Sequence, residues 1–237
     1  MGPHRGPIRT AATGWFGRGG DFQDLRNDLW RLDTGIWTWV AGDSIDMPSP
    51  RYGTLGVTSP DNVPGGHGLG AGWSTPAGLF VFGGYGVDIN IAEGEMNDVW
   101  RHTSAGWAWV AGSATADPLG SYGTRGLAAA TNTPGGRTSA AYAGVDDGVV
   151  IFGGFGREQT GSLGPLGDLW FFDGVRWTWM AGSRFTGSTG VYGTRGVPHP
   201  ANAPGARVSA VMWRGTGNSV WLFGGSSRND LWRWQPN

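Results

Sequence analysis

The 237-residue sequence contains no cysteine, no lysine and no long apolar run. Without cysteine the chain has no disulfide, no thiolate metal site and no cysteine nucleophile. Its cysteine content therefore indicates no particular cellular compartment. All 17 basic residues are arginine, they form no basic run, and the formal net charge is −1. Because phosphate neutralisation dominates nucleic-acid affinity, we expect no nucleic-acid partner. No apolar stretch approaches the roughly 18 residues of a membrane-spanning helix, so no membrane span is expected.

Glycine and aromatic residues, in contrast, are abundant. The chain has 46 Gly and 14 Pro, but also 15 Trp and 10 Phe. Disordered chains lack such large apolar side chains, whereas many short strands joined by tight turns use both classes. The composition therefore favours an ordered all-β fold. Residues 1–13 lack the apolar core of a secretory signal, and we interpret them as an N-terminal tail that is flexible or docks on a partner.

Several motifs recur with a nearly fixed spacing. The stretches "WTWVAG", "WAWVAG" and "WTWMAG" are 70 residues apart and begin at Trp37, Trp107 and Trp177. A "YGTxG" motif keeps the same spacing and begins at Tyr52, Tyr122 and Tyr192. An Asp-x-Trp motif recurs four times and ends at Trp30, Trp100, Trp170 and Trp232. Such self-similarity is typical of repeat architectures and decides the fold class.

One repeat predicts four strands. Short apolar segments begin near residues 138, 148, 168 and 176, each bounded by Gly, Asp or Pro, and none shows a helical period. We expect a four-stranded antiparallel sheet, and several sheets must stack to bury their faces. The two Trp of each Trp-x-Trp point to one face of a strand. We therefore expect the equivalent residues Trp39, Trp109 and Trp179 to be structural and to pack one sheet against the next.

These motifs resemble the kelch repeat: an apolar strand that ends in Gly-Gly, a variable loop, "NDLW", a turn and a Trp-x-Trp strand. The longer "YGTRG…PGGR" insertion is similar to a kelch subtype with a repeat of about this length. The resemblance covers roughly residues 14–237 and implies a β-propeller like the central domain of galactose oxidase. Closed kelch propellers usually have six or seven blades, whereas this sequence supplies two full and two partial ones. We expect a single domain, 14–237, with blades at about 14–42, 67–112, 137–182 and 207–237.

Alternating strand directions place short turns at one end of the sheets and all long loops at the other. The long-loop end carries the insertions 43–66, 113–136 and 183–206, and function on a rigid scaffold tends to lie in such loops. Candidate ligand or partner residues there are Tyr52, Tyr122, Tyr192, Arg125 and Arg195, which could bind a carboxylate, a sugar or a peptide. The alternative is that "YGTxG" is a folded loop whose Tyr packs between blades and whose Arg bonds loop carbonyls.

Other polar residues of the repeat have structural interpretations. Arg137, Arg207 and His67 follow Pro-Gly turns, and we expect them to make structural hydrogen bonds. The repeated Asp28, Asp98, Asp168 and Asp230 are expected to cap turns by bonding the backbone. The acidic clusters, Asp21, Asp24 and Asp28, and Asp88, Glu93, Glu95 and Asp98, offer oxygen ligands of the kind that calcium takes, but their spacing matches no EF-hand. No metal or other cofactor is therefore predicted.

The function that these patterns favour is a non-catalytic protein-interaction or scaffold module that belongs to a larger assembly. Trp232 and Trp234 lie in the last predicted strand with no following strand to cover them, so the terminal blades are expected to contact a protein partner or a second copy. A carbohydrate-binding module is the alternative, with a glycan as ligand. An oxidase-related enzyme is less favoured, because the copper radical oxidases require a tyrosine cross-linked to cysteine. The four histidines, moreover, show no ligand spacing.

Overall fold

The computed structural model describes residues 25–236. It is all-β, with 45% strand and 1% helix, which confirms the predicted class. The one helical element within the described range is the 3-10 turn Thr216–Asn218. The predicted tail at 1–13 and the start of the first predicted blade, residues 14–24, lie outside the described residues, and so do Asp21 and Asp24.

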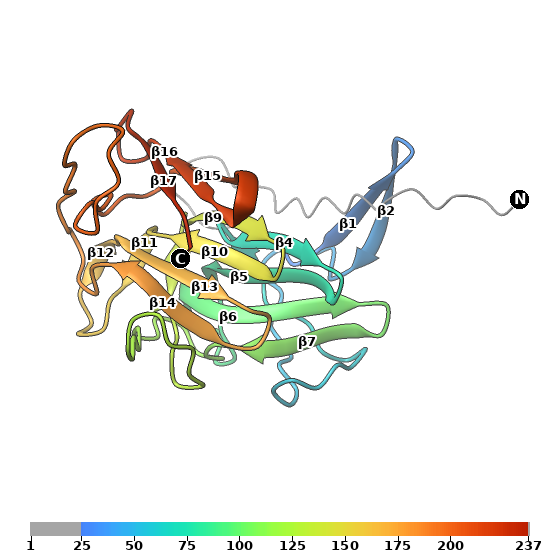
Figure 1. The fold of residues 1–237 in the computed structure, drawn as a ribbon. Coiled ribbons are helices and arrows are strands. Elements are labelled where there is room, and N and C mark those ends of the chain that lie inside the picture. The colour runs from blue at the N-terminus through green and yellow to red at the C-terminus, as the bar shows by residue number, and fades with distance from the viewer. Residues whose placement is uncertain (1–24, 237) are drawn as a thin grey trace, which may run out of the picture.

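Most of the strands form four successive antiparallel sheets, which we number in chain order (Figure 1). The first sheet is a hairpin of β1 (Leu29–Asp33) and β2 (Ile36–Ala41). The second sheet contains β4 (Ala71–Thr75), β5 (Gly78–Val87), β6 (Glu93–Thr103) and β7 (Gly106–Ala111), with the short β3 (His67–Gly68) also paired to β5. In Figure 1 the first hairpin projects away from the other sheets.

The third and fourth sheets repeat this order. The third contains β9 (Ala141–Val145), β10 (Gly148–Phe152), β13 (Asp168–Phe172) and β14 (Trp177–Gly182). The fourth contains β15 (Val211–Arg214), β16 (Val220–Phe223) and β17 (Leu231–Trp234). A small separate sheet consists of β8 (Arg137–Thr138), β11 (Phe155–Arg157) and β12 (Leu163–Pro165). The four predicted strands of one repeat therefore pair in chain order.

The segments after the Gly-Gly pairs are more ordered than the sequence indicates. Gly83 and Gly84 have positive φ angles of 57° and 97°, as expected at a strand exit, yet β5 continues through them after a register shift. The resulting long hairpin is closed by the Asp88 carboxylate, which accepts hydrogen bonds from the backbone N–H groups of Asn90 and Ala92. A carboxylate that accepts hydrogen bonds from the N–H groups of a turn stabilises the hairpin at that turn.

Consecutive sheets pack face to face through apolar side chains. Leu29 of the first sheet lies in one cluster with Trp100 and Trp107 of the second. The rings of Phe82 in the second sheet and Trp177 in the third are 5.0 Å apart. A third cluster joins the third sheet to the fourth. Burial of large aromatic rings between sheets is the main apolar contribution to such a stack.

The tryptophans do not all share one environment. The first Trp of the Trp-x-Trp pair is buried in β7 and β14, and so is Trp179. Trp109 is partly buried, whereas Trp39 is 50% exposed. The prediction of a packed structural tryptophan is therefore met at Trp179 but not at Trp39 within the described residues. The reason is that β7 and β14 are each covered by a long loop, while no described segment covers β2.

Candidate functional site

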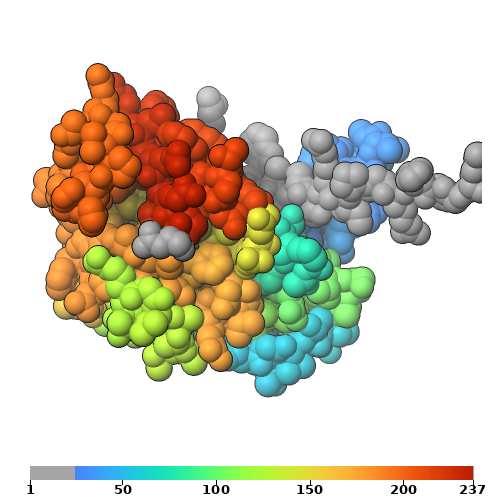
Figure 2. Space-filling view, in the orientation of Figure 1, coloured from blue at the N-terminus to red at the C-terminus, as the bar shows by residue number. Residues whose placement is uncertain are grey.

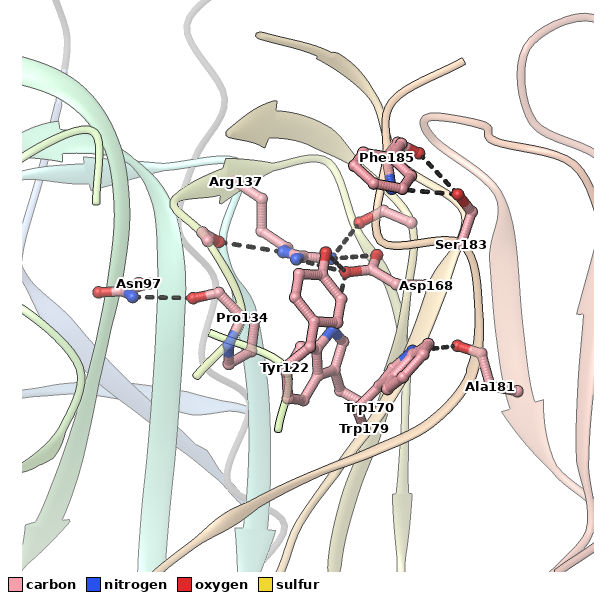
Figure 3. Close-up of polar contacts among 12 residues, drawn as sticks. Asn97, Tyr122, Pro134, Arg137, Asp168, Trp170, Trp179, Ala181, Ser183 and Phe185 are labelled. Carbon is pink, nitrogen blue, oxygen red and sulfur yellow. Dashed lines mark hydrogen bonds and ion pairs between the residues drawn. The ribbon is translucent and has the colours of Figure 1, made fainter. Parts of the chain in front are cut away.

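The long-loop end is organised around the repeated aspartate, which is buried in the second and third sheets and is seen with most partners at Asp168 (Figure 3). The Tyr122 hydroxyl and the Trp170 indole N–H both donate to Asp168 Oδ2, at 2.8 and 2.7 Å. Arg137 Nη1 and Nη2 donate to the two carboxylate oxygens, at 2.7 and 2.9 Å. The side chains of Arg137 and Asp168 are fully buried. The arrangement is a bidentate ion pair closed by two neutral donors.

The electrostatics of this group favour a permanent ion pair. Burial alone would raise the pKa of Asp168, but the Arg137 charge and the hydrogen bonds from Arg137, Trp170 and Tyr122 hold it below its usual range. Burial and the neighbouring Asp168 charge raise the pKa of the Tyr122 hydroxyl. Arg137 also donates to the carbonyl oxygens of Gly135 and Gly153. The polar side-chain atoms of Tyr122, Arg137, Asp168 and Trp170 all have hydrogen-bond partners, so the group ties the loop to the sheet. We call this group, and its equivalents in the other repeats, the clamp.

The same clamp recurs in the fourth sheet with one change of environment. Tyr192, Trp232 and Arg207 donate to Asp230, with Arg207 again bidentate at 2.6 and 3.0 Å. Burial alone would raise the pKa of Asp230, but hydrogen bonds from Arg207, Trp232 and Tyr192 and the Arg207 charge hold it below its usual range. The side chain of Asp230 is 15% exposed, whereas Asp168 is fully buried. The clamp therefore forms here as well, but it is open to solvent on one side.

In the second sheet the arginine is replaced by His67. Tyr52 and Trp100 still donate to Asp98 Oδ2, at 2.8 and 2.7 Å. His67 Nε2 lies 3.6 Å from the same oxygen, beyond hydrogen-bond distance, and the buried Asp98 Oδ1 has no hydrogen-bond partner. This clamp is therefore less completely satisfied than the one around Asp168.

The prediction that the repeated aspartates cap turns is therefore wrong about their hydrogen-bond partners. Turn capping predicts bonds to backbone N–H groups, but the bonds that Asp98, Asp168 and Asp230 make go to tyrosine, tryptophan and arginine side chains. The expectation that Arg137, Arg207 and His67 make structural hydrogen bonds agrees with the geometry for the two arginines. It is wrong for His67, whose buried Nε2 has no hydrogen-bond partner. The signal that could have revealed the clamp is the constant separation of 46 residues from Tyr52 to Asp98 and from Tyr122 to Asp168.

We call the long insertions 43–66, 113–136 and 183–206 the cover loops, because the first two cover the last strand of the following sheet. In the second cover loop, Gly126 N–H donates to the Trp179 carbonyl at 2.9 Å, and Asn132 Nδ2 donates to the Trp177 carbonyl at 3.1 Å. The Arg125 guanidinium stacks over the Trp179 ring at 4.6 Å. The cover loop therefore acts as an additional edge strand that satisfies the outer backbone groups of β14.

The first cover loop repeats these contacts on β7. Gly56 N–H donates to the Trp109 carbonyl at 2.7 Å, and Asn62 Nδ2 donates to the Trp107 carbonyl at 3.1 Å. The Tyr52 ring contacts Trp109 edge-on at 5.1 Å, as the Tyr122 ring contacts Trp179 at 5.4 Å. Tyr52 and Tyr122 are therefore parts of the packing, which agrees with the structural alternative for the "YGTxG" loop.

The third cover loop is the exception. Tyr192 is 53% exposed, whereas Tyr52 and Tyr122 are 3% and 2% exposed. Arg195, the equivalent of Arg125, is exposed and is without a ring to stack on among the described residues. Trp232 and Trp234 are partly buried against the interface of the third and fourth sheets. In Figure 2 this loop and the fourth sheet form the orange-to-red lobe at the upper left of the molecule.

A second polar group lies beside the hairpin β5–β6. Arg157 Nη2 donates to Asp117 Oδ2 at 3.0 Å, and Asp117 Oδ1 accepts the Glu95 backbone N–H. Burial and a hydrogen bond to Asp117 raise the pKa of Glu95 to about 7. Across residues 25–236, no group of three or more His, Cys, Asp or Glu side chains could hold a metal ion. The described chain also contains no helix that is long and apolar enough to cross a membrane.

The sequence matches no protein-family model, and it is not significantly similar to any curated protein.

Proposed function

We propose that this chain is a non-catalytic, kelch-type β-propeller module that joins a larger assembly through its long-loop end and its two terminal sheets. The proposal rests on one contrast between equivalent positions. Tyr52 and Tyr122 of the inner clamps are 3% and 2% exposed, whereas the equivalent Tyr192 is 53% exposed. In the same way Trp107 and Trp177 are buried, whereas Trp37 and Trp39 of the first sheet are 48% and 50% exposed. Large apolar surface of this kind marks interaction sites in soluble proteins.

The second support is the state of the sheet edges. In the second and third sheets the outer strand is bonded by a cover loop, so its backbone groups are satisfied. In the described range, neither β2 nor β17 has a strand or loop on its outer edge. Unpaired edges that present N–H and C=O groups invite pairing with another chain. A protein partner or a second copy therefore fits both terminal sheets.

The residues that could serve a carbohydrate-binding module are less well placed. Two of the three repeated tyrosines are buried and donate their hydroxyls to aspartates, so neither ring is open to stack on a sugar. No catalytic role is proposed for the clamp residues, because the polar side chains around Asp168 and Asp230 bond one another and the backbone.

Site-specific photo-crosslinking tests the proposal. A photoreactive residue is placed at Ile36 in the first sheet or at Leu231 in the fourth, which are 67% and 55% exposed, and at Val175 as the control. Val175 is 71% exposed but belongs to the third sheet, which is not a terminal one, and lies in the turn between β13 and β14 that is equivalent to the β1–β2 turn beside Ile36. We expect protein crosslinks from Ile36 and Leu231 and none from Val175. Crosslinking that follows exposure alone, or binding on a glycan array, would contradict the proposal.

A further inference from the structure

We infer that the outer edge of β17 and the third cover loop, residues 183–206, form a docking site for one extended peptide segment of another protein, with the sequence Trp-x-Trp-x-Ala-Gly. This inference rests on the proposed function and gives the chemistry of one partner. The observations that carry it are the two filled copies of the same site, on β7 and β14, within this chain.

The filled copies define what the site holds. On β14, the cover loop donates two hydrogen bonds to the carbonyl groups of Trp177 and Trp179, and the Arg125 guanidinium stacks on the second ring. The inner edge of β14 pairs with β13, with Trp179 opposite Trp170. An occupant of the fourth site would have the same two neighbours, the cover loop and β17, with its second Trp opposite Trp232.

At the fourth sheet, the third cover loop keeps the backbone geometry of the second, although no described strand lies between this loop and β17. Gly193 and Gly196 have φ angles of 57° and 82°, close to the 58° and 78° of Gly123 and Gly126 in the second cover loop. The loop is closed by the same bridge, Val191 with Ala203. Since the loop is already in its bound conformation, an incoming strand does not have to order it, which favours binding.

The hydrogen-bond donors of the third cover loop, however, do not all have acceptors in the described residues. Asn132 Nδ2 bonds the Leu127 and Trp177 carbonyls, whereas the equivalent Asn202 Nδ2 bonds only the loop carbonyl of Val197, at 3.1 Å. The Gly126 N–H reaches the Trp179 carbonyl, but no acceptor for the equivalent Gly196 N–H is seen in the described range. These donors stand where the filled sites have the carbonyl groups of a Trp-x-Trp strand.

The Ala and Gly positions of the Trp-x-Trp-x-Ala-Gly motif follow from backbone contacts that Ala181 and Gly182 make on β14. The Trp179 indole N–H donates to the Ala181 carbonyl, which fixes the ring against its own strand. Gly182 has φ of +85°, and a Cβ there would meet the Gly167 carbonyl oxygen at 2.0 Å. Only glycine combines this conformation with this closeness. Gly42 and Gly112 approach the carbonyl oxygens of Asn27 and Asn97 in the same way. The equivalent residue of the fourth sheet is Asn229, so the same requirement applies to the occupant.

A separate segment fits better than a second copy of this chain. Strand β2 has the required sequence, but its inner edge is already paired with β1, with Trp30 opposite Trp39. To pair with β17, β2 would have to leave β1, because β1 and β17 need the same edge. The other two Trp-x-Trp strands, β7 and β14, are enclosed by cover loops.

The test uses the full chain and a labelled synthetic peptide of residues 174–184, GVRWTWMAGSR, which contains the β14 motif. Fluorescence anisotropy measures binding, and hydrogen exchange locates it. We expect saturable binding that protects the amides of β17 and of residues 192–202. Peptides with Trp179→Ala or Gly182→Ala should bind at least about tenfold more weakly, from the lost ring burial or the backbone strain.

Matched arginine variants of the protein locate the contact. Arg195→Ala should weaken peptide binding about fivefold, the effect of one exposed cation–π contact of roughly 1 kcal/mol. Arg125→Ala makes the same change over the resident Trp179 and should leave peptide binding unchanged. Both side chains are exposed, so both variants are expected to fold. Equal weakening by the two variants, or protection confined to other strands, would overturn the inference.

The outcomes also separate this inference from the proposed function. Absence of peptide binding, together with protein crosslinks from the terminal sheets, would overturn the docking site and leave the interaction module standing. Peptide binding without such crosslinks would support the docking site and count against the module's place in an assembly. A dimer of the chain that Trp39→Ala dissociates would overturn the choice of occupant, because it would identify β2 of a second copy as the docked strand.

Discussion

Replacing Arg137 with leucine is expected to destabilise the chain strongly. Arg137→Leu keeps much of the apolar bulk but removes four hydrogen bonds, two to Asp168 and one each to the Gly135 and Gly153 carbonyls. The carboxylate then remains buried with only its tyrosine and tryptophan donors. Removing one partner of a buried ion pair costs about 3–5 kcal/mol. Urea denaturation followed by tryptophan fluorescence should show a loss of this size in the free energy of unfolding near neutral pH.

The loss should depend on pH in a defined direction. In the parent chain, the lowered pKa of Asp168 contributes stability that is present above the unfolded-state pKa of about 4 and is lost as the pH falls through the folded-state pKa. Without the arginine, burial favours the protonated acid, so the folded-state pKa rises above the unfolded value and the variant gains stability as the pH falls. The difference in the free energy of unfolding between parent and variant should therefore become smaller as the pH falls from about 7 to about 4.

The matched control is Arg207→Leu in the fourth sheet. Arg207 makes the same bidentate pair with Asp230, but that carboxylate is partly exposed, and water can solvate it when the cation is removed. The loss should be smaller than for Arg137→Leu. The reasoning is refuted if Arg137→Leu costs less than about 1 kcal/mol at neutral pH, within the range of an exposed pair, or if the difference from the parent is the same at both pH values.

Three further changes test other parts of the structure. His67→Arg should raise the melting temperature, because it supplies Asp98 with the bidentate cation of the other repeats; a lower melting temperature would show that the second site has no room for it. Gly182→Ala should destabilise the chain more than Gly35→Ala, since both have φ near +85° but only Gly182 faces a carbonyl at 2.0 Å, and equal losses in urea would contradict this. Glu95, whose pKa of about 7 lies above its unfolded value of about 4.5, favours the fold when protonated, so stability should fall as the pH rises from about 4.5 to about 7 and level off above that. Glu95→Gln should abolish that fall, and an unchanged pH profile would assign it to another group.

Much of the strand framework could be predicted from the sequence. The segments expected to begin near residues 148, 168 and 176 are β10, β13 and β14, because short apolar runs between Gly, Asp and Pro carry a strong strand signal. The pattern predicts the first strand of the repeat as one continuous strand from residue 138. In the structure it is divided at Ser139, which has a positive φ of 52°. A non-glycine residue in this conformation gives no clear sequence signal.

The clamp could be predicted only in part. Tyr122, Arg137 and Asp168 were each recognised as repeated residues, but their partners lie 31 and 46 residues apart in the chain. A single residue type does not indicate which distant side chain it meets. The contrast between Tyr122 and Tyr192 was also beyond the sequence, because both stand in the same "YGTRG" motif. What differs is the strand beneath each loop, β14 under one and no described strand under the other.

Hydrogen exchange of the isolated chain shows whether its terminal sheets are open for a partner while its inner sheets are complete. We predict slow exchange for the amides of β14 and of the second cover loop, at Gly126 in particular. We predict fast exchange at the equivalent Gly196 and along the outer edge of β17. Equal protection of the two cover loops in a chain that sediments as a compact monomer would contradict the account, because it would mean that the fold closes on itself.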